Sequence, residues 1–285
     1  MQSQTDKAID FRLRHRGIGV LLLPNAWDVA SARVLEEAGF SALATTSAGI
    51  AFSLGYPDGQ RISREEMMAR IGRIARAVHL PVTADLEWGY GSTAEEIVRT
   101  TREVIEAGAV GINLEDASGR SDQPLLPLDR VLEKIKVVRE TAAAMRMPLV
   151  VNARTDIYLL EGGNPDASYT EAIRRLIAFR DAGADCVFAP GLKDAETIGR
   201  LVKDVACPVN ILAVPGTPSI DELEKLGVAR VSVGSGFMRA TLGALRGMAE
   251  ELRNSGTYSA LAGGIPYKDL NEMMERRAPN APPTP

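Results

Sequence analysis

The chain has few of the side chains that most often act as catalytic bases or nucleophiles. Its 285 residues include two histidines and two cysteines. His79 stands just before a predicted strand, which places it at the amino-terminal face of a parallel α/β fold, away from the face that carries active sites. Cys186 and Cys207 also stand at strand starts, and we expect both to be buried structural thiols. A histidine base and a disulfide framework are therefore not expected.

Other absences narrow the function class further. No apolar run approaches the roughly 20 residues of a membrane span, and the polar segment Met1–Arg16 lacks a signal-peptide core. The net charge of -4 predicts neither nucleic acid nor an anionic membrane as a partner. No nucleotide-binding glycine motif occurs, and no lysine lies within a predicted strand, which argues against Schiff-base chemistry. We expect a cytoplasmic protein that acts on a small molecule.

What the chain does contain is a regular alternation of short apolar runs and helical patterns. The runs, bounded by Gly, Pro, Asn or Asp, predict eight strands. These strands are Gly19–Pro24, Ala42–Thr46, Val82–Asp85, Gly111–Glu115, Leu149–Arg154, Cys186–Ala189, Val209–Ala213 and Arg230–Val233. The predicted helices are Asp28–Ala38, Ser63–Val78, Thr93–Ala107, Leu128–Arg146, Tyr169–Ala182, Asp194–Val205, Ser219–Leu226 and Phe237–Arg253.

Strict strand–helix alternation indicates a parallel sheet, and about eight units favour a closed (β/α)8 TIM barrel over an open sheet. We expect the barrel to occupy residues 1–254 and a C-terminal extension to occupy residues 255–285. The extension is predicted to contain a helix over Ile265–Arg277 and a disordered, proline-rich tail over Ala278–Pro285.

Acidic side chains gather where the predicted strands end. Asp85 and Glu87 stand at positions i and i+2, so their side chains point to one side; Glu115 ends the next strand, and Asp58 lies in the loop after the second strand. Carboxylates that converge on one barrel mouth raise one another's pKa values unless a cation lies among them. Oxygen ligands of this kind suit Mg²⁺, with Mn²⁺ as the alternative. Asp85, Glu87 and Glu115 are therefore the candidate metal ligands. A solvated loop start or a salt bridge to Arg154 is the plainer interpretation.

Several further polar residues at the strand ends suit a substrate carboxylate. Arg154 carries a planar guanidinium that binds carboxylates in a fork, although an ion pair with a strand-end acid explains it as well. Ser47-Ala48-Gly49 could present backbone N–H groups and a hydroxyl, or could be a simple tight turn. Gly234-Ser235-Gly236 opens the last helix, where barrels often bind phosphate, but close packing of a turn explains this glycine pair equally well. Tyr90 either lines the mouth or packs beside it.

Five short segments together resemble the isocitrate lyase / phosphoenolpyruvate mutase superfamily, over about Leu22 to Arg253. None of the five is specific alone. The segments are Pro24–Ala32, Thr45–Gly49, Asp85–Gly91, Gly111–Asp116 and Asn152–Asp156. The resemblance implies an α/β barrel whose last helix is exchanged between subunits, in a homo-oligomer built as a dimer of dimers.

The resemblance also implies site roles. Asp85 would bind Mg²⁺ directly or through water, and Glu87, Glu115 and Asp58 would hold the water shell of the ion. Arg154, the Ser47-Ala48 turn and Asn210 would hold the carboxylate of an α-oxo or 2-hydroxy acid. The chemistry implied is cleavage or formation of a C–C or C–P bond beside a pyruvate unit, through an enolate. Candidate catalytic residues are thus Asp58, Tyr90, Glu115 and Arg154, and the proton donor stays open among Tyr90, Ser118 and a metal-bound water.

Three departures from the family pattern bear on the substrate. The loop Asp116–Leu125 contains no Cys, Lys or His, whereas isocitrate and methylisocitrate lyases carry a Lys-Lys-Cys-Gly-His type motif there, and mutase chemistry uses a Lys-Asn pair. The sixth strand ends Phe188-Ala189-Pro190, where the methylisocitrate lyases place a glutamate. Glu87 replaces the more usual aspartate. The first two departures argue against isocitrate and methylisocitrate as substrates.

We therefore expect a Mg²⁺-dependent lyase that cleaves or decarboxylates a small α-oxo or 2-hydroxy carboxylate. One alternative is a C–P bond enzyme, such as a phosphonopyruvate hydrolase or a carboxyphosphonate phosphorylmutase. The other alternative is a barrel that binds an α-oxo acid without catalysis, because the loop after the fourth strand lacks an obvious acid or base.

Overall fold

The computed structural model of the chain describes residues 2–160 and 165–276, so the predicted tail Ala278–Pro285 lies outside the described residues. Its strands form one parallel sheet, hydrogen-bonded in the order β1-β9-β8-β7-β6-β5-β4-β3-β2. The strands are β1 Leu21–Leu23, β2 Asn25–Ala26, β3 Leu43–Thr45, β4 Val82–Asp85, β5 Gly111–Glu115, β6 Val150–Arg154, β7 Cys186–Phe188, β8 Val209–Leu212 and β9 Arg230–Ser232.

Pro24 explains why the first strand of the barrel appears as two. It separates β1 from β2, and it has no backbone N–H to give to a neighbour. Leu21–Leu23 pairs with β9, whereas Asn25 and Ala26 pair with β3. The carbonyl of Pro24 still accepts a hydrogen bond from the backbone N–H of Ala44, at 3.0 Å. The segment therefore joins the two edges of the sheet, and the predicted (β/α)8 barrel is confirmed.

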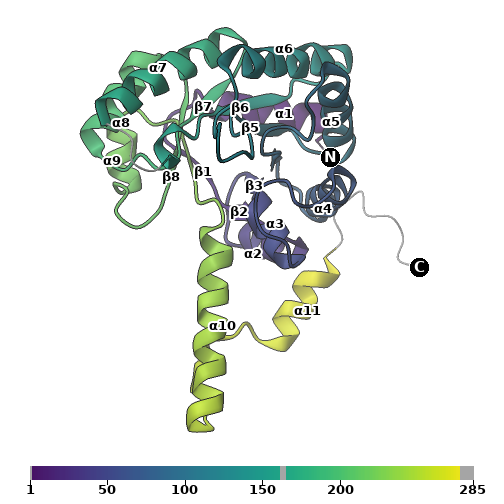
Figure 1. Ribbon diagram of the computed structural model, residues 1–285. Coiled ribbons are helices and arrows are strands. Elements are labelled where there is room, and N and C mark those ends of the chain that lie inside the picture. The colour runs from purple at the N-terminus through teal and green to yellow at the C-terminus, as the bar shows by residue number, and fades with distance from the viewer. Residues whose placement is uncertain (1, 161–164, 277–285) are drawn as a thin grey trace.

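Helices follow the strands in turn and surround the barrel (Figure 1). Asp28, Ser63, Thr93 and Ser219 cap helices by accepting a backbone N–H in the first turn, as their positions in the sequence suggest. The helices are α1 Gln4–Arg14, α2 Val29–Glu37, α3 Ser47–Ser53, α4 Arg64–Ala77, α5 Ala94–Glu106, α6 Leu128–Ala144, α7 Pro165–Asp181, α8 Ala195–Val205, α9 Ile220–Lys225, α10 Gly236–Ser255 and α11 Tyr267–Glu275, with 3-10 turns η1 Ile157–Leu159 and η2 Ser259–Gly263. Helices α1 and α3 were not expected from the sequence.

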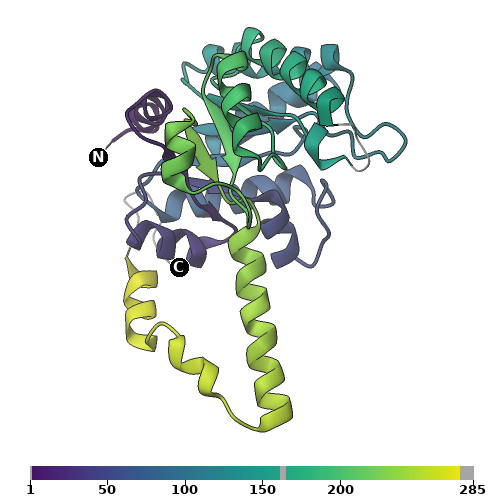
Figure 2. The ribbon, with the colours of Figure 1, turned by 90° about the vertical axis from the view of Figure 1, so that its left-hand side faces the viewer.

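Helix α1 closes one end of the barrel (Figure 2). Phe11 on this helix is fully buried. Gln4 donates to the carbonyl of Ala109 at 2.9 Å, and Arg12 donates to the carbonyl of Leu149 at 3.1 Å. Both carbonyls stand just before a strand, so α1 covers the amino ends of β5 and β6. The carboxyl ends of the strands are left at the opposite end of the barrel, where the acidic side chains stand.

Helix α10 projects away from the barrel, and the chain then turns back so that α11 reaches α2 (Figures 1 and 2). Within α10, Leu242 is 43% and Leu245 58% exposed, so burial within its own chain does not explain their apolar character. Met273 of α11 is buried, and its carbonyl accepts a hydrogen bond from Arg33 at 2.8 Å. Neither α10 nor any other helix in the described ranges is both long and apolar enough to cross a membrane.

The packing of α1 beneath β5 can be tested at Gly111. A Cβ there would lie 3.0 Å from the Phe11 ring and 3.0 Å from the backbone carbonyl of Val150, which cannot rotate away. We expect Gly111→Ala to lower the free energy of unfolding by about 1–3 kcal/mol through overpacking. Gly243→Ala is the matched control, because nothing lies within 4 Å of its Cβ position in α10. Urea denaturation of both variants measures the difference, and equal stability would contradict this description of the barrel floor.

Candidate functional site

Asp85 is the central carboxylate at the mouth of the barrel. It ends β4 and is 8% exposed. Its Oδ2 accepts hydrogen bonds from the backbone N–H of Ser47 at 3.0 Å and from the Ser47 hydroxyl at 2.8 Å. Its own backbone N–H donates to the Thr45 hydroxyl at 2.9 Å. Its Oδ1 is buried and has no hydrogen-bond partner among the described residues. One oxygen is thus fixed and the other is left for a ligand.

Ser47-Ala48-Gly49 forms the first turn of α3 and is not a simple tight turn. Thr46 caps this helix by accepting the N–H of Gly49 at 3.3 Å. The sequence suggested that Ser47 donates to a substrate carboxylate. In the structure both of its donors bind Asp85 instead. Gly49 serves packing, since a Cβ there would lie 2.6 Å from the Thr46 methyl group.

Glu87 holds two loops together. Its Oε2 accepts the backbone N–H of Gln60 at 2.5 Å, and its Oε1 accepts the Tyr90 hydroxyl at 3.1 Å. Gln60, Glu87 and Tyr90 all have positive φ, at 48°, 51° and 51°, and the described chain has only two other non-glycine residues of this kind. Left-handed backbone costs energy in residues with a Cβ and is often found at functional sites. Three of the five non-glycine residues with positive φ in the described chain therefore lie at one carboxylate beside Asp85.

Arg154 forms an ion pair with a strand-end acid, which was one of the two interpretations of this residue from the sequence. Its Nη1 lies 2.9 Å from Oε2 of Glu115, and its Nη2 donates to Oδ2 of Asp156 at 3.0 Å. Burial acts to lower the pKa of Arg154, but the two carboxylates outweigh it and the pKa is raised. Asp156 in turn donates its N–H to Asp116, which pairs with Arg175 of α7 at 3.1 Å. The sequence gave no role to Asp156 or Arg175, although Asp156 lies in a motif that resembles the family.

The acids at the barrel mouth act on one another. Burial, followed by the charges of Asp85 and Asp58, raises the pKa of Glu87 to about 7. Burial also raises the pKa of Glu115, although Arg154 opposes the shift. Desolvation and the charge of Asp85 raise the pKa of Asp58, which lies in an exposed loop. This mutual repulsion is what the sequence predicts for acids that share one barrel mouth without a cation.

The residues present fit a cation that is held by few protein atoms. Across residues 2–160 and 165–276, no three Asp, Glu, His or Cys side chains form a group that could hold a metal ion. Glu87 and Glu115, predicted as ligands, face Gln60, Tyr90 and Arg154 instead. The unpartnered Oδ1 of Asp85 is the oxygen that suits a cation. Mg²⁺ commonly takes one or two carboxylates and completes its shell with water and substrate oxygens.

Below Asp85, the barrel interior is polar. Asn152 donates to Oδ1 of Asn113 at 2.8 Å, and Arg230 donates to the same oxygen at 3.0 Å. Asn210, the predicted substrate ligand, is fully buried; it donates to the Ser232 hydroxyl at 3.1 Å, and its Oδ1 has no partner in the part of the chain described. The sequence gave no role to Asn113 or Asn152, although both lie in segments that resemble the family, and none to Arg230. The available signal was a polar residue at an inward position of an otherwise apolar strand.

Gly234-Ser235-Gly236 is engaged in a structural contact. The backbone N–H groups of Val233 and Gly234 both donate to Oδ1 of Asn25, each at 2.9 Å. This side chain therefore ties the end of β9 to β2, where the barrel closes. The contact supports the plainer interpretation of the turn and leaves these two N–H groups unavailable for a phosphate.

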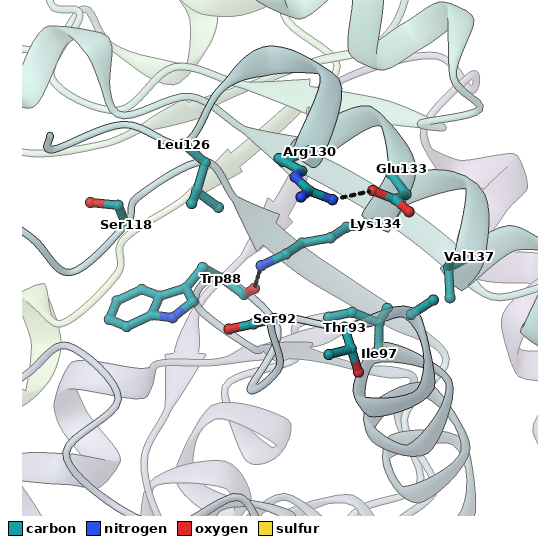
Figure 3. A pocket seen from close by; sticks show the side chains of 11 residues that line it. Trp88, Ser92, Thr93, Ile97, Ser118, Leu126, Arg130, Glu133, Lys134 and Val137 are labelled. Carbon is teal, nitrogen blue, oxygen red and sulfur yellow. Dashed lines mark hydrogen bonds and ion pairs between the residues drawn. The ribbon is translucent and has the colours of Figure 1, made fainter.

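A separate pocket of about 290 Å³ lies outside the barrel, between the Trp88 loop, the start of α5 and the face of α6 (Figure 3). Its lining includes none of the predicted metal or substrate residues. The Lys134 ammonium reaches across to donate to the Trp88 carbonyl at 2.8 Å (Figure 3). Ser118 also lines this pocket, and its hydroxyl bonds within its own loop. Lys134, at the edge of this pocket, therefore holds the loop that follows β4 from its outer side.

His79, Cys186 and Cys207 stand before or at the start of strands, as the sequence predicted, but only Cys186 is buried; Cys207 is partly exposed, so the prediction of a buried thiol is wrong there. His79 is mostly exposed and lies 3.5 Å from Glu36, before β4. His15 is buried on α1, at the closed end of the barrel. Burial raises the pKa of Cys186 to about 12 and that of Cys207 to about 11, so neither thiol ionises near neutral pH. None of these side chains supplies catalysis at the barrel mouth.

Two curated relatives share most of this chain. It is 38% identical over 263 residues to an uncharacterised protein of Mycobacterium tuberculosis, which covers 92% of this chain and 94% of that protein. It is 29% identical over 285 residues to the 2-methylisocitrate lyase of Bacillus subtilis, with 96% and 88% coverage.

Solved structures agree with these relatives. A Burkholderia cenocepacia protein, assigned provisionally as a lyase or mutase, superposes with a TM-score of 0.90 at 42% identity, covering 96% of this chain and 97% of that one. Oxaloacetate acetylhydrolase in complex with its product oxalate gives a TM-score of 0.84 at 26% identity, with 96% and 95% coverage. The family model described as phosphoenolpyruvate phosphomutase matches residues 11–253. The chain therefore belongs to the phosphoenolpyruvate mutase family, within the isocitrate lyase / phosphoenolpyruvate mutase superfamily.

Proposed function

We propose that this protein is a Mg²⁺-dependent enzyme that cleaves a C–C bond in a small α-oxo or 2-hydroxy carboxylate, or decarboxylates it. One observation carries the proposal: Asp85 presents a buried, unpartnered oxygen among acids whose pKa values are raised. A divalent cation beside that oxygen would relieve the repulsion between these acids. Mn²⁺ would fill the same role in binding experiments.

The substrate class is supported by the names of relatives. Besides 2-methylisocitrate lyase and oxaloacetate acetylhydrolase, they include a 2,3-dimethylmalate lyase of Eubacterium barkeri, 27% identical to this chain. All of these names refer to small di- or tricarboxylates. The loop Asp116–Leu125 has no Cys, Lys or His, and β7 is followed by Ala189-Pro190 without a glutamate. These departures favour oxaloacetate-like and malate-like diacids over methylisocitrate.

Arg154 is suited to hold the substrate carboxylate despite its ion pairs. A guanidinium has five N–H donors. Three contacts, one to Glu115 and two to Asp156, account for three of them. Two donors remain for a substrate oxygen, so structural pairing and substrate binding are compatible. The two carboxylates also fix the plane of the guanidinium, which lowers the entropy lost when the substrate binds.

A divalent cation, when bound, supplies positive charge that stabilises the enolate oxygen formed during bond cleavage. The chain's own contribution is to orient Asp85 through the two donors of Ser47 and to keep the site dry. For the proton donor, Tyr90 is favoured over Ser118. The Tyr90 hydroxyl is bonded to Glu87 beside Asp85, whereas Ser118 lines the outer pocket.

The family match itself supports the alternative of C–P chemistry. Against it, the backbone N–H groups of Val233 and Gly234 donate to Asn25, so these two donors of the turn are not available to a phosphate. Phosphate release from phosphonopyruvate would identify this alternative. A binding barrel without catalysis would instead bind diacids and release no product.

Replacement of Asp85 tests the proposal directly. Oxo- and hydroxy-diacids are incubated with the protein, with and without Mg²⁺, and the products pyruvate, glyoxylate and oxalate are followed by NMR. We expect Asp85→Ala to lower Mg²⁺-dependent turnover by roughly 10²-fold or more, as for other preorganised charge-stabilising groups. Asp10→Ala, on the exposed face of α1, is the control and should retain full turnover. Full activity in the Asp85 variant would contradict the proposal.

The raised pKa of Glu87 predicts how stability depends on pH in the absence of a divalent cation. The folded pKa is about 7 and the ordinary value is 4.5, so between these values the folded state keeps a proton that the unfolded state has released. The free energy of unfolding should therefore fall as pH rises from about 5 to 8, with a contribution from Glu87 on the order of 3 kcal/mol. Glu87→Gln should flatten this fall in urea denaturation, and Mg²⁺ should reduce it. An unchanged slope of the unfolding free energy against pH in the variant would show that Glu87 does not cause this pH dependence.

We also propose that the protein is a homo-oligomer in which α10 packs against a partner chain, as in a dimer of dimers with exchanged last helices. The exposed apolar side chains Leu242 and Leu245 support this. The double variant Leu242→Glu, Leu245→Glu should sediment as a monomer. Glu250 lies on a different face of the same helix from Leu242 and Leu245, so Glu250→Lys should leave the assembly intact. A wild-type protein that sediments as a monomer would contradict the proposal.

A further inference from the structure

Arg230 is a buried cation without an acidic partner. It stands on β9 inside the barrel, is fully buried, and is among the largest side chains with no exposure to solvent. Its Nη2 donates to Oδ1 of Asn113 at 3.0 Å. Its Nε and Nη1 have no hydrogen-bond partner, and no carboxylate lies within ion-pair distance in the ranges that the structure describes.

The other arginines near the barrel mouth differ from Arg230 in this respect. Arg154 pairs with Glu115 and Asp156, and Arg175 pairs with Asp116 and Glu171. Their charges are therefore balanced locally. An unpaired buried charge is costly to a fold, and a hydrophobic residue of similar volume would often stabilise the barrel more. The unbalanced charge of Arg230 therefore calls for a functional explanation.

The position of Arg230 relates it to Asp85. Asn113, which Arg230 contacts, is the direct register partner of Asp85 across β4 and β5. Burial lowers the pKa of Arg230 to about 10, so the side chain is still charged at neutral pH; Cys186 and, to a smaller extent, Asp85 act in the opposite direction. The positive charge thus lies under the site, within electrostatic reach of the carboxylate proposed to bind the cation.

We propose that Arg230 is a fixed cation that lowers the affinity of Asp85 for a divalent cation alone and raises the affinity of the site for a dianionic carboxylate substrate. This inference rests on the proposed function of Asp85. Like charges repel strongly in a protein interior, where the effective dielectric constant is low. A dication and a dicarboxylate together carry no net charge, so Arg230 would favour their binding as a pair over entry of the cation first.

The test measures binding and not turnover. Mn²⁺ is titrated into the apoprotein and followed by electron paramagnetic resonance, and oxalate is titrated by calorimetry at saturating Mn²⁺. We expect Arg230→Met to bind Mn²⁺ alone at least tenfold more tightly than wild type and to bind oxalate at least tenfold more weakly. Arg230→Lys keeps the charge and should resemble wild type in both titrations.

The opposite signs of these two effects separate charge from structural damage, because a distorted site would lose affinity for both probes. Arg230→Gln is the second neutral variant, should Arg230→Met fail to fold, with the same two shifts expected. Asn113→Ala keeps the charge and removes its hydrogen bond, so it should change both affinities much less than Arg230→Met.

Two outcomes distinguish this inference from the proposed function. If Asp85→Ala binds Mn²⁺ as tightly as wild type, the cation does not bind at Asp85 and the proposed function fails. If Asp85→Ala loses Mn²⁺ but the neutral Arg230 variants bind Mn²⁺ no more tightly than wild type, the proposed function stands and the role of Arg230 is overturned.

Discussion

The two hydrogen bonds from Ser47 to one oxygen of Asp85 determine the rest of the site. They fix the carboxylate at the end of β4 and leave its second oxygen buried and free. The neighbouring acids have other partners: Glu87 accepts hydrogen bonds from Gln60 and Tyr90, and Glu115 forms an ion pair with Arg154. A group of like charges is thereby held together, with one oxygen left unsatisfied. Such an arrangement is costly to the fold unless a ligand of opposite charge completes it.

The fold supplies the rigidity that this arrangement needs. Parallel strands bring β4, β5 and β6 to the same barrel mouth, and the Pro24 segment closes the ring. Helix α1 seals the other end, so the polar interior around Asn113 and Arg230 is shielded from solvent. In this low-dielectric interior, a buried charge such as that of Arg230 interacts strongly with charged groups at the barrel mouth. Under the role proposed for Arg230, the barrel core contributes to ligand binding as well as to stability.

The sequence predicted the barrel well because the barrel leaves a periodic pattern along the chain. Short apolar runs and helical patterns alternate throughout, and Asp85, Glu115 and Arg154 were placed at strand ends on that basis alone. The resemblance to the superfamily then agreed with the family to which the chain belongs. Helix α3 was missed because its seven residues are too few to show a period. Helix α1 was missed because only Ala8 and Phe11 of its mixed sequence are buried.

The details of the site could not be predicted because they depend on backbone conformation and on partners distant in sequence. No sequence pattern indicates that Gln60, Glu87 and Tyr90 adopt positive φ. Nor does any pattern indicate that the backbone N–H and the hydroxyl of Ser47 both donate to Asp85. Arg230 lies in an apolar strand, and its burial is visible only once the strands are closed into a barrel. Helix α10 projects from the barrel, and the partner chain that we propose to cover its apolar residues is not specified by a single sequence.

The central claim is that the free oxygen of Asp85 binds a divalent cation together with a carboxylate substrate. Crystals soaked with Mn²⁺ and oxalate, with data collected at a wavelength where manganese scatters anomalously, test it directly. We expect one strong anomalous peak about 2.1 Å from Oδ1 of Asp85, with oxalate on the side of Arg154. A well-occupied manganese peak elsewhere, with Asp85 still unpartnered, would contradict it.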